Sequence, residues 1–395
     1  MTASAPRIAI VGGGLGGTTA AILLQQAGLD VQVYEQAPQI NRIGAGIHLH
    51  ANVMKVMQAI GVDKTMLDIG LCPETWLNRT WDNGEVLFAP PVQQWEAQYG
   101  APHLIMHRGD MQAVLTSALR SESMKFGKRL VDLDERNGDM LLRFEDGTSA
   151  EADVVIGADG VNSKIREILL GPEAPVYTGF VAYRAIYPVS LLGDFRVAAD
   201  TTKWWSDDRH WAQEDRHFII YYLTRARDEI YFVTGSPDPN WQGGVSPVPA
   251  EIDEIVECYK GFHPEVMNVI KACPKASKWP LLEREPLPLW SRNRIVLLGD
   301  ACHPMKPHMG QGAGMAIEDA AVLVRCIKDK GDDIEGAFKM YREGRIARTS
   351  KVQRVSHENT WMNYPMDPSW VFAYDAMTVP LDSPTAHLEG AQQVA

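Results

Sequence analysis

The feature that most constrains the fold is a glycine-rich turn between a short apolar strand and a helix of small residues. The strand covers residues 8–11, and the turn places Gly12, Gly14 and Gly17 in the spacing G-x-G-x-x-G. Glu35 follows the next apolar strand, eighteen residues beyond the last glycine. In this context the glycines provide a tight turn, close approach to a pyrophosphate and helix packing, and the acid binds a ribose 2′-hydroxyl. The segment therefore predicts a Rossmann-like dinucleotide site, and Glu35 favours an unphosphorylated adenosine ribose, as in FAD or NAD.

A second strand, loop and helix occur near the C-terminal end. The apolar run 295–298 stops at Asp300, and a loop with Gly310 and Gly312 leads into an alanine-rich helix, residues 317–328. A carboxylate at a strand end can accept hydrogen bonds from ribityl or ribose hydroxyls, and glycines let backbone N–H groups approach an anionic ring at a helix N-terminus. An ordinary βα turn has the same pattern, so this segment alone leaves both interpretations open.

The composition indicates a globular protein. The chain has 395 residues, of which 45% are apolar, so it is long enough for two or three domains. Its net charge is −12 and no Lys or Arg run is present, so we expect no nucleic-acid partner. No apolar run reaches the roughly 18 residues of a membrane span, so we expect no membrane contact. Five cysteines without C-x-x-C spacing predict free thiols, no bound metal and a cytoplasmic location.

The remaining periodicity predicts an α/β protein with α+β elements. We expect a Rossmann-like fold, an inserted, mainly antiparallel β-sheet that forms the substrate domain, and a C-terminal helical segment. The nucleotide-binding domain is assigned to residues 1–74, 100–177 and 281–345, the substrate domain to residues 75–99 and 178–280, and the C-terminal helix and tail to residues 346–395.

Two arginines and a histidine are further candidates for a cofactor contact. Arg42 lies in a glycine-punctuated segment that we expect to be a loop, residues 41–52, and Arg108 precedes a helix whose expected N-cap is Asp110. A cation at either place can reach a phosphate or a ring edge. Arg42 could equally be a solvated loop charge. His48 alternates with apolar neighbours, so a core histidine is the alternative to a site residue.

Three motifs together carry a family resemblance. They are residues 12–17 with Glu35, residues 155–160 with the strand-end acid Asp159, and residues 299–304 followed by residues 310–312. In this order, and across nearly the whole chain, they resemble the single-component FAD-dependent aromatic hydroxylases, the class of p-hydroxybenzoate and salicylate hydroxylases.

The resemblance implies a cofactor, a reductant and a co-substrate. NADH would reduce FAD, and O₂ would then form a flavin C4a-hydroperoxide whose distal oxygen attacks an electron-rich ring. A homodimer is also implied, whereas the choice between NADH and NADPH and the oligomeric state stay open. The resemblance places the following residues at the cofactor: Gly12, Gly14, Leu15, Gly17, Glu35, Gln36, Arg42, His48, Arg108, Leu130, Asp159, Asp300, Pro307, Gly310, Gly312 and Ala313.

Three segments indicate a branch within this class. Residues 42–48, 203–206 and 302–309 most resemble the proteins that act on 6-hydroxynicotinate. In that branch the oxygen attacks the carbon that bears the carboxylate, so carbon dioxide leaves and 2,5-dihydroxypyridine forms. The resemblance thus implies decarboxylative hydroxylation of a hydroxylated pyridine carboxylate. Salicylate 1-monooxygenase and 3-hydroxybenzoate 6-monooxygenase activities remain alternatives, and a flavin-binding redox regulator without turnover is the alternative outside enzymes.

The reaction also needs a base. Removing the proton of the ring hydroxyl raises electron density where the oxygen bonds, and such a transfer is typically worth roughly 10²–10⁴-fold. His217 and Tyr221 lie four apart in an alternating segment, so on a strand they face one side; an aromatic packing stripe with a surface histidine is the alternative. Their spacing resembles the substrate-side pair of the branch, in which His48 and His308 match further catalytic positions. An apparent insertion leaves open whether His210 or His217 takes the histidine's place.

Overall fold

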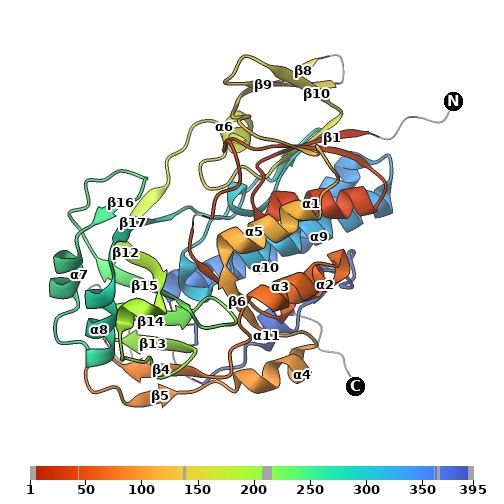
Figure 1. Ribbon diagram of the computed structural model, residues 1–395. Coiled ribbons are helices and arrows are strands. Elements are labelled where there is room, and N and C mark those ends of the chain that lie inside the picture. The colour runs from red at the N-terminus through yellow and green to blue at the C-terminus, as the bar shows by residue number, and fades with distance from the viewer. Residues whose placement is uncertain are drawn as a thin grey trace.

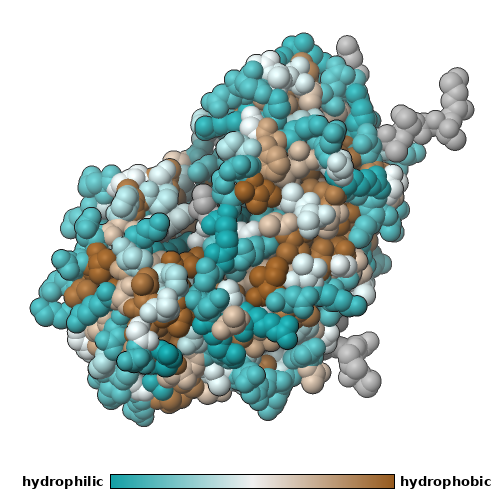
Figure 2. Space-filling model, in the orientation of Figure 1, coloured by the Kyte–Doolittle hydropathy of each residue, from teal (hydrophilic) through white to brown (hydrophobic). Residues whose placement is uncertain are grey.

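The computed structural model describes residues 6–42, 44–136, 139–206, 216–359, 361–362 and 365–389. Within these residues the chain forms four sheets, with the longest helices packed side by side beside the largest parallel sheet (Figure 1). Hydrophilic residues cover most of the face seen in Figure 2 and are interrupted by hydrophobic patches. None of the described helices combines the length and the apolar character that crossing a bilayer requires.

A six-stranded sheet contains the strand that precedes the glycine-rich turn. Its central strands are parallel, and β1 lies between β11 and β2. Nearly every residue of β1 and β11 is buried, as expected for parallel strands that are covered on both faces. The sheet confirms the expected α/β class. In sheet order its strands are β18 (Ser291–Arg292), β19 (Ile295–Leu297), β11 (Val154–Gly157), β1 (Arg7–Val11), β2 (Asp30–Tyr34) and β7 (Met124–Lys125).

Three long helices run beside this sheet, in the order α1, α9, α10 (Figure 1). Small residues of α1 allow close packing on α9, because a Cβ added at Gly16 would lie only 2.9 Å from the Cβ of Ala316. Helix α10 also runs across residues 345 and 346, between which the sequence analysis places the start of the C-terminal segment. The α-helices are α1 (Leu15–Gln26), α2 (Ala51–Ile60), α3 (Asp63–Ile69), α4 (Trp95–Tyr99), α5 (Arg108–Ser117), α6 (Lys164–Leu170), α7 (Ile252–Cys258), α8 (Pro264–Ala272), α9 (Gly312–Lys330), α10 (Ile334–Glu358), α11 (Ser369–Phe372) and α12 (Pro384–Glu389).

An eight-stranded sheet forms the second large unit and lies apart from the first (Figure 1). It confirms the expected mainly antiparallel sheet, although β4 pairs parallel with β13. Helices α7 and α8 contribute residues to the hydrophobic core that this sheet covers. In sheet order its strands are β16 (Val248–Ala250), β17 (Ala276–Glu283), β12 (Val176–Pro188), β15 (Glu229–Pro237), β14 (His217–Tyr222), β13 (Thr201–Trp205), β4 (Trp76–Thr80) and β5 (Val86–Phe88).

Two smaller sheets complete the fold. One is the meander of β8 (Leu130–Arg136), β9 (Asp139–Phe144) and β10 (Ser149–Ala152), seen at the top of Figure 1. The other pairs β3 (Gly46–Leu49) with β6 (Leu104–His107). The expectation of a loop throughout residues 41–52 is therefore wrong.

The expected N-cap of α5 is also wrong. The helix begins at Arg108, and its N-cap is His107, whose Nδ1 accepts a hydrogen bond of 2.9 Å from the backbone N–H of Gly109. Asp110 lies inside the first turn, where a carboxylate still interacts favourably with the helix dipole.

Candidate active site

A cleft of about 720 Å³ opens at the carboxyl ends of the parallel strands. This is where ligands bind in doubly wound sheets. The predicted cofactor residues that line it are Gly12, Gly14, Glu35, Gln36, Arg108, Leu130 and Asp159.

The three glycines of the first turn serve different purposes. A Cβ on Gly12, which has φ +105°, would lie 2.3 Å from the carbonyl oxygen of Ala158, and one on Gly17 would lie 2.1 Å from the oxygen of Gly12. A Cβ on Gly14 would meet nothing within 4 Å. Gly12 and Gly17 are therefore required by the chain itself, whereas Gly14 leaves space in the cleft at the N-terminus of α1. This fits a ligand with a pyrophosphate.

Two carboxylates at strand ends hold the backbone around this cleft. Glu35 accepts hydrogen bonds from the N–H groups of Gly13 at 2.7 Å and Ala37 at 2.8 Å, so it orders the glycine turn. Asp159 accepts from the N–H groups of Lys164 and Ile165 at the start of α6. Each carboxylate oxygen has two lone pairs, so Glu35 retains acceptor capacity for a ribose hydroxyl.

A second cavity, of about 310 Å³, lies between the eight-stranded sheet and the loop before α9. On the sheet side, Lys203 and Thr201 of β13 face the cavity together with Tyr221 of β14. On the loop side, η3 (Gly299–Ala301) carries Asp300 and η4 (Pro307–Met309) carries His308. The predicted residues that line this cavity are His48, Arg108, Tyr221, Asp300, Pro307, His308, Gly310, Gly312 and Ala313.

His48 and Tyr221 contact each other at one end of the second cavity. Their rings meet edge to face with centroids 4.5 Å apart. Gly46 makes room for this contact, because a Cβ there would lie 2.4 Å from a carbon of the Tyr221 ring. Burial lowers the pKa of His48 to about 3 and raises the pKa of Tyr221 well above its usual value. The pair is therefore a neutral imidazole beside a neutral phenol at ordinary pH.

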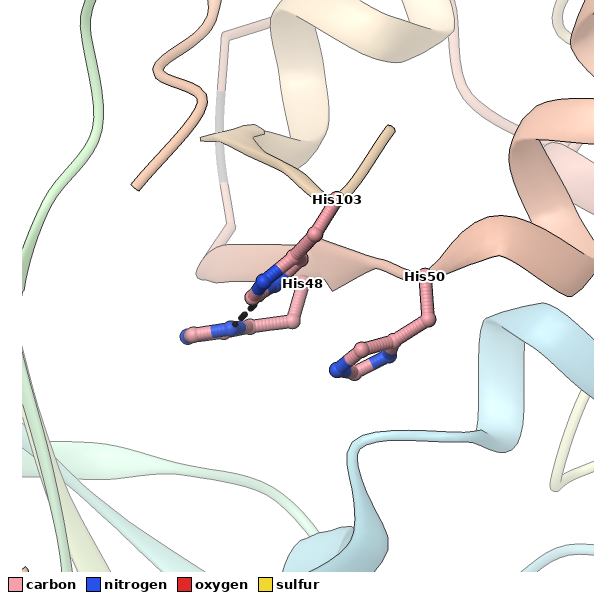
Figure 3. A group of neighbouring side chains, drawn as sticks. All are labelled: His48, His50 and His103. Atoms are coloured by element: carbon pink, nitrogen blue, oxygen red, sulfur yellow. Dashed lines mark hydrogen bonds between the residues drawn. The ribbon is translucent and has the colours of Figure 1, made fainter. Parts of the chain in front are cut away.

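His103 lies behind His48. Nδ1 of His48 and Nε2 of His103 are 3.0 Å apart and share a hydrogen bond, and the other nitrogen of His48 points away from His103 (Figure 3). His50 stacks on His103 with centroids 4.5 Å apart and planes 16° apart. These three histidines thus form an aromatic cluster in which His48 and His103 share a hydrogen bond, and one ring nitrogen of each lies within 4.8 Å of the others.

At the other end of the second cavity, His308 contacts His217. Their ring centroids are 5.5 Å apart, and Nδ1 of His308 donates a hydrogen bond of 2.8 Å to the carbonyl of Ser356. His217 faces the same side of β14 as Tyr221, but it lies beside His308 and is not among the residues that line the cavity. His210 lies outside the described residues.

Arg108 lines both the cleft and the second cavity, whereas Arg42 lines neither of them. Arg108 is exposed and lines the cleft, the second cavity and a third cavity of about 720 Å³. The guanidinium of Arg42 lines only the third of these and binds the carboxylates of Asp110, at 2.7 Å, and Glu229. Leu15 and Gly17 pack in the core beside the cleft and are not among its lining residues.

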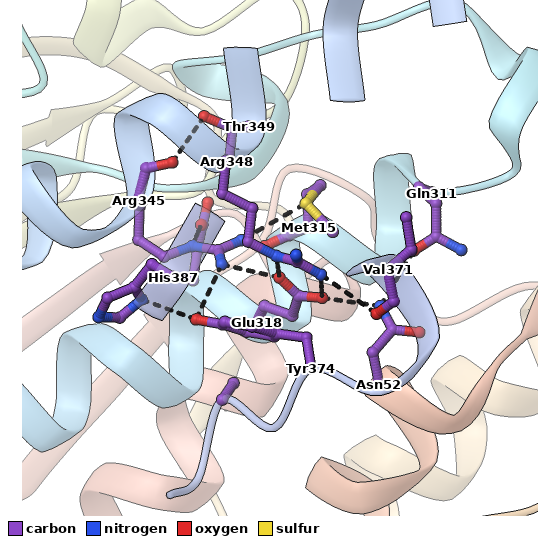
Figure 4. Close-up of polar contacts among 12 residues, drawn as sticks. Asn52, Gln311, Met315, Glu318, Arg345, Arg348, Thr349, Val371, Tyr374 and His387 are labelled. Atoms are coloured by element: carbon purple, nitrogen blue, oxygen red, sulfur yellow. Dashed lines mark hydrogen bonds and ion pairs between the residues drawn. The ribbon is translucent and has the colours of Figure 1, made fainter. Parts of the chain in front are cut away.

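A buried polar network supports the loop at the second cavity (Figure 4). Glu318 of α9 accepts hydrogen bonds from Arg345 at 2.7 Å and Arg348 at 2.8 Å, both on α10. Its other oxygen accepts from Asn52 at 2.7 Å, and Asn52 also donates to Gln311 in the loop. Gln311 in turn hydrogen-bonds His50 at 3.0 Å. The network thus connects α10 and α9 to the wall of the second cavity.

Three residues at the second cavity were missed in the sequence analysis. His103 precedes β6 and reaches His48 across the β3–β6 pair, and Arg184 of β12 lines the cavity while lying 4.9 Å above the ring of Trp279. Lys203 lies in a strand where residues alternate, so Thr201 and Lys203 could have been placed on one face with a strand period of two.

The fold and the two cavities define a flavoprotein of the aromatic-hydroxylase class, in which a dinucleotide cleft adjoins a smaller aromatic pocket. The chain belongs to the FAD-binding domain family, whose model matches residues 6–355. FAD is its cofactor, and the open space at Gly14 and the acceptor capacity of Glu35 fit that group.

Named relatives and a solved structure extend this assignment. The chain is 50% identical to the 6-hydroxynicotinate 3-monooxygenase of Bordetella bronchiseptica over 378 residues, which cover 95% of this chain and 97% of that one. It is 49% identical to the 6-hydroxynicotinate 3-monooxygenase of Pseudomonas fluorescens, with 96% and 97% covered. A salicylate hydroxylase in a substrate complex has the same fold, with a TM-score of 0.78, 24% identity, and 99% and 100% covered.

Proposed function

We propose that the protein is an FAD-dependent monooxygenase that hydroxylates 6-hydroxynicotinate with loss of the carboxyl group, giving 2,5-dihydroxypyridine. The observation that carries the proposal is the similarity, at about half of all positions and over nearly their full length, to two 6-hydroxynicotinate 3-monooxygenases. NADH is the proposed reductant. One atom of O₂ enters the ring, the other leaves as water, and the carboxyl carbon leaves as carbon dioxide.

The residues of the cleft are proposed to hold the adenosine diphosphate part of FAD. Gly14 would admit the pyrophosphate, Glu35 would bind the ribose, and Arg108 lies between the cleft and the second cavity. The glycines of the loop before α9 would let its backbone approach the flavin ring. When bound, FAD would carry the reducing equivalents of NADH and activate O₂, and the protein would supply the binding, the orientation and the proton transfer.

We assign the proton transfer to His48 and Tyr221. With the shared proton on Nδ1 of His48, the other ring nitrogen is available to accept the proton of the substrate hydroxyl. His48 is neutral, so this nitrogen keeps its lone pair, and the phenol of Tyr221 can donate a hydrogen bond to the resulting oxyanion. Losing the proton makes the ring more reactive toward electrophilic oxygen, at the carbon para to the hydroxyl among others.

We also propose that the two large sheets correspond to two functional parts. The cleft lies at the six-stranded sheet, whereas Lys203 and Tyr221 reach the second cavity from the eight-stranded sheet. This supports the division into residues 1–74, 100–177 and 281–345 on one side and residues 75–99 and 178–280 on the other, with the first part extended to the end of α10.

The activity is tested by product analysis. Purified protein with NADH and O₂ should form 2,5-dihydroxypyridine and carbon dioxide from 6-hydroxynicotinate, with less turnover of salicylate and 3-hydroxybenzoate. Preference for either benzoate would replace the proposed substrate. If no aromatic acid stimulates NADH oxidation, a flavin-binding regulator becomes the better assignment.

The first substitution concerns Tyr221. Tyr221→Phe should keep stoichiometric FAD, because the residue lies outside the cleft. Loss of a donor to a developing oxyanion should lower kcat and kcat/KM together, by on the order of 10²-fold. Product formed per NADH should also fall if reduced flavin releases hydrogen peroxide unproductively.

Two histidine variants complete that experiment. His217→Ala should act mainly on KM, since His217 contacts His308 and does not line the second cavity. His210→Ala resolves the apparent insertion: a severe defect there, with normal kinetics in the His217 variant, would transfer the role to His210. Normal behaviour of all three variants would remove β14 from the active site.

A further substitution concerns Asp300. Its exposed side chain lies where the second and third cavities meet, so we propose that it binds hydroxyls of the flavin's ribityl chain. Asp300→Ala should weaken FAD binding by about 1.5–3 kcal/mol, the usual contribution of a hydrogen bond to a charged group. Titration of the folded apoprotein with FAD measures this loss, and unchanged affinity would contradict the role.

A further inference from the structure

Lys203 is a buried lysine at the wall of the second cavity. It lies on β13, between β14 and β4, and only 3% of the residue is exposed. Its ammonium lies 3.6 Å from the ring centroid of Trp205, and among the described residues no carboxylate lies within ion-pair distance of it. A cation–π contact with one ring is weaker than the hydration that a buried ammonium loses. The group therefore lacks the anion that buried charges usually pair with.

The surroundings give the second cavity two chemically different ends. Lys203 lies opposite Ile219, and its ammonium is directed toward Trp205, which pairs with His217. Burial is the main cause that lowers the pKa values of His217 and His308, and the protonated form of Lys203 lowers both further. Tyr221 lies two residues beyond Ile219 in the opposite direction, beside His48. One end thus carries a cation, and the other carries the phenol and the imidazole.

Other groups at the cation end are less suited to bind an anion. Neutral His308 uses its single N–H to bind the carbonyl of Ser356. Lys306 is already paired with Glu283 at 3.2 Å. Arg184 lies against Trp279 and also faces the open third cavity. Among the described lining residues, Lys203 combines burial with the lack of a carboxylate partner. Burial lowers the pKa of its amine well below the usual value, so a carboxylate bound beside it would favour the protonated form.

We propose that Lys203 binds the ring carboxylate of the substrate, and that its separation from Tyr221 selects acids whose hydroxyl is para to the carboxylate. The inference rests on the proposed function and adds a specificity-determining residue to it. In 6-hydroxynicotinate the two groups lie at opposite ends of the ring, so one can meet Lys203 while the other meets Tyr221 and His48. In an ortho-hydroxy acid both groups lie on one edge, and only one end of the cavity can be used.

Binding of nicotinate and nicotinamide isolates the carboxylate contact. The two probes differ by a carboxylate and a neutral amide, and both lack the ring hydroxyl. Each probe is titrated into the FAD-containing enzyme, and its binding is followed by flavin absorbance. The Lys203→Met substitution should weaken the binding of nicotinate by about 10–100-fold, without a matching loss for nicotinamide. The matched control is Lys278→Met in the same sheet, because Lys278 is paired with Asp238 and Glu254 at 2.8 and 2.7 Å. It should leave the preference for nicotinate intact.

Three results would overturn the proposal. Equal weakening of both probes by Lys203→Met would indicate a purely structural role. An unchanged preference in that variant, with loss of preference in Arg184→Met, would assign the carboxylate to Arg184. Equal affinity of the unmodified enzyme for 6-hydroxynicotinate and 2-hydroxynicotinate would contradict the two-ended cavity, and this measurement needs no variant. Failure of the enzyme to form 2,5-dihydroxypyridine would instead reject the proposed function, while the nicotinate test of Lys203 would still give its own answer.

Discussion

Gly14→Glu is expected to abolish stoichiometric FAD binding while the chain remains folded. Gly14 is the N-cap of α1 and lines the cleft, where an added Cβ meets nothing within 4 Å. The new carboxylate would take the place of an anion at the helix N-terminus and would repel the pyrophosphate. Opposed like charges cost several kcal/mol, so we expect a loss on the order of 4 kcal/mol, or about a thousandfold in affinity.

The other glycines of the turn provide the contrast. Gly12→Ala should lower the thermal stability of the apoprotein, because its Cβ would lie 2.3 Å from the oxygen of Ala158 at a φ of +105°. Gly14→Ala should fold normally. The measurements are flavin absorbance per protein after purification, FAD titration and the unfolding temperature of each apoprotein. Full retention of FAD by the glutamate variant would place the pyrophosphate elsewhere.

The parts of the fold that were predicted correctly have strong local signals. The glycine turn, the apolar strand before it and the small-residue helix after it follow each other within the first 26 residues, and α1 ends there. Turn geometry, strand burial and helix packing are all determined there by neighbouring residues. Period-two alternation likewise predicted β14, with its pair of His217 and Tyr221 on one face.

The errors concern contacts between distant segments. β3 has only four residues and exists because it pairs with β6, almost sixty positions later, so glycines and a lone histidine suggested a loop. The sequence did not predict His107 as the N-cap of α5, because its position in the sequence indicates the end of a strand. Lys203 was part of the resembling segment 203–206 but was not predicted to line the site, because its lack of a carboxylate partner appears only when β13, β14 and η4 are brought together.

Glu318→Gln is expected to cause the largest loss of stability. Glu318, Arg345 and Arg348 have fully buried side chains, and the carboxylate accepts hydrogen bonds from both guanidinium groups. Burial alone would raise the pKa of Glu318, but the two arginines lower it below the ordinary value, so the charged form is the native one. A glutamine has the same shape, yet it has one acceptor oxygen and no charge. Removing one partner of a buried ion pair typically costs about 3–5 kcal/mol, since the remaining charge stays buried without compensation.

A surface ion pair on the neighbouring helix α10 is the matched control for this substitution. Glu343 lies 4.0 Å from Lys339, and their side chains are 53% and 74% exposed, so Glu343→Gln should change the free energy of unfolding by less than about 1 kcal/mol. Urea unfolding of both variants, followed by circular dichroism and by release of FAD, compares them directly. Because Glu318 also binds Asn52, which holds Gln311 in the loop, FAD release should precede loss of helical signal more clearly in the Glu318 variant than in the parent. A Glu318 variant as stable as the Glu343 variant would show that Asp319, which binds Arg345 at 2.7 Å, is sufficient to hold α9 and α10 together.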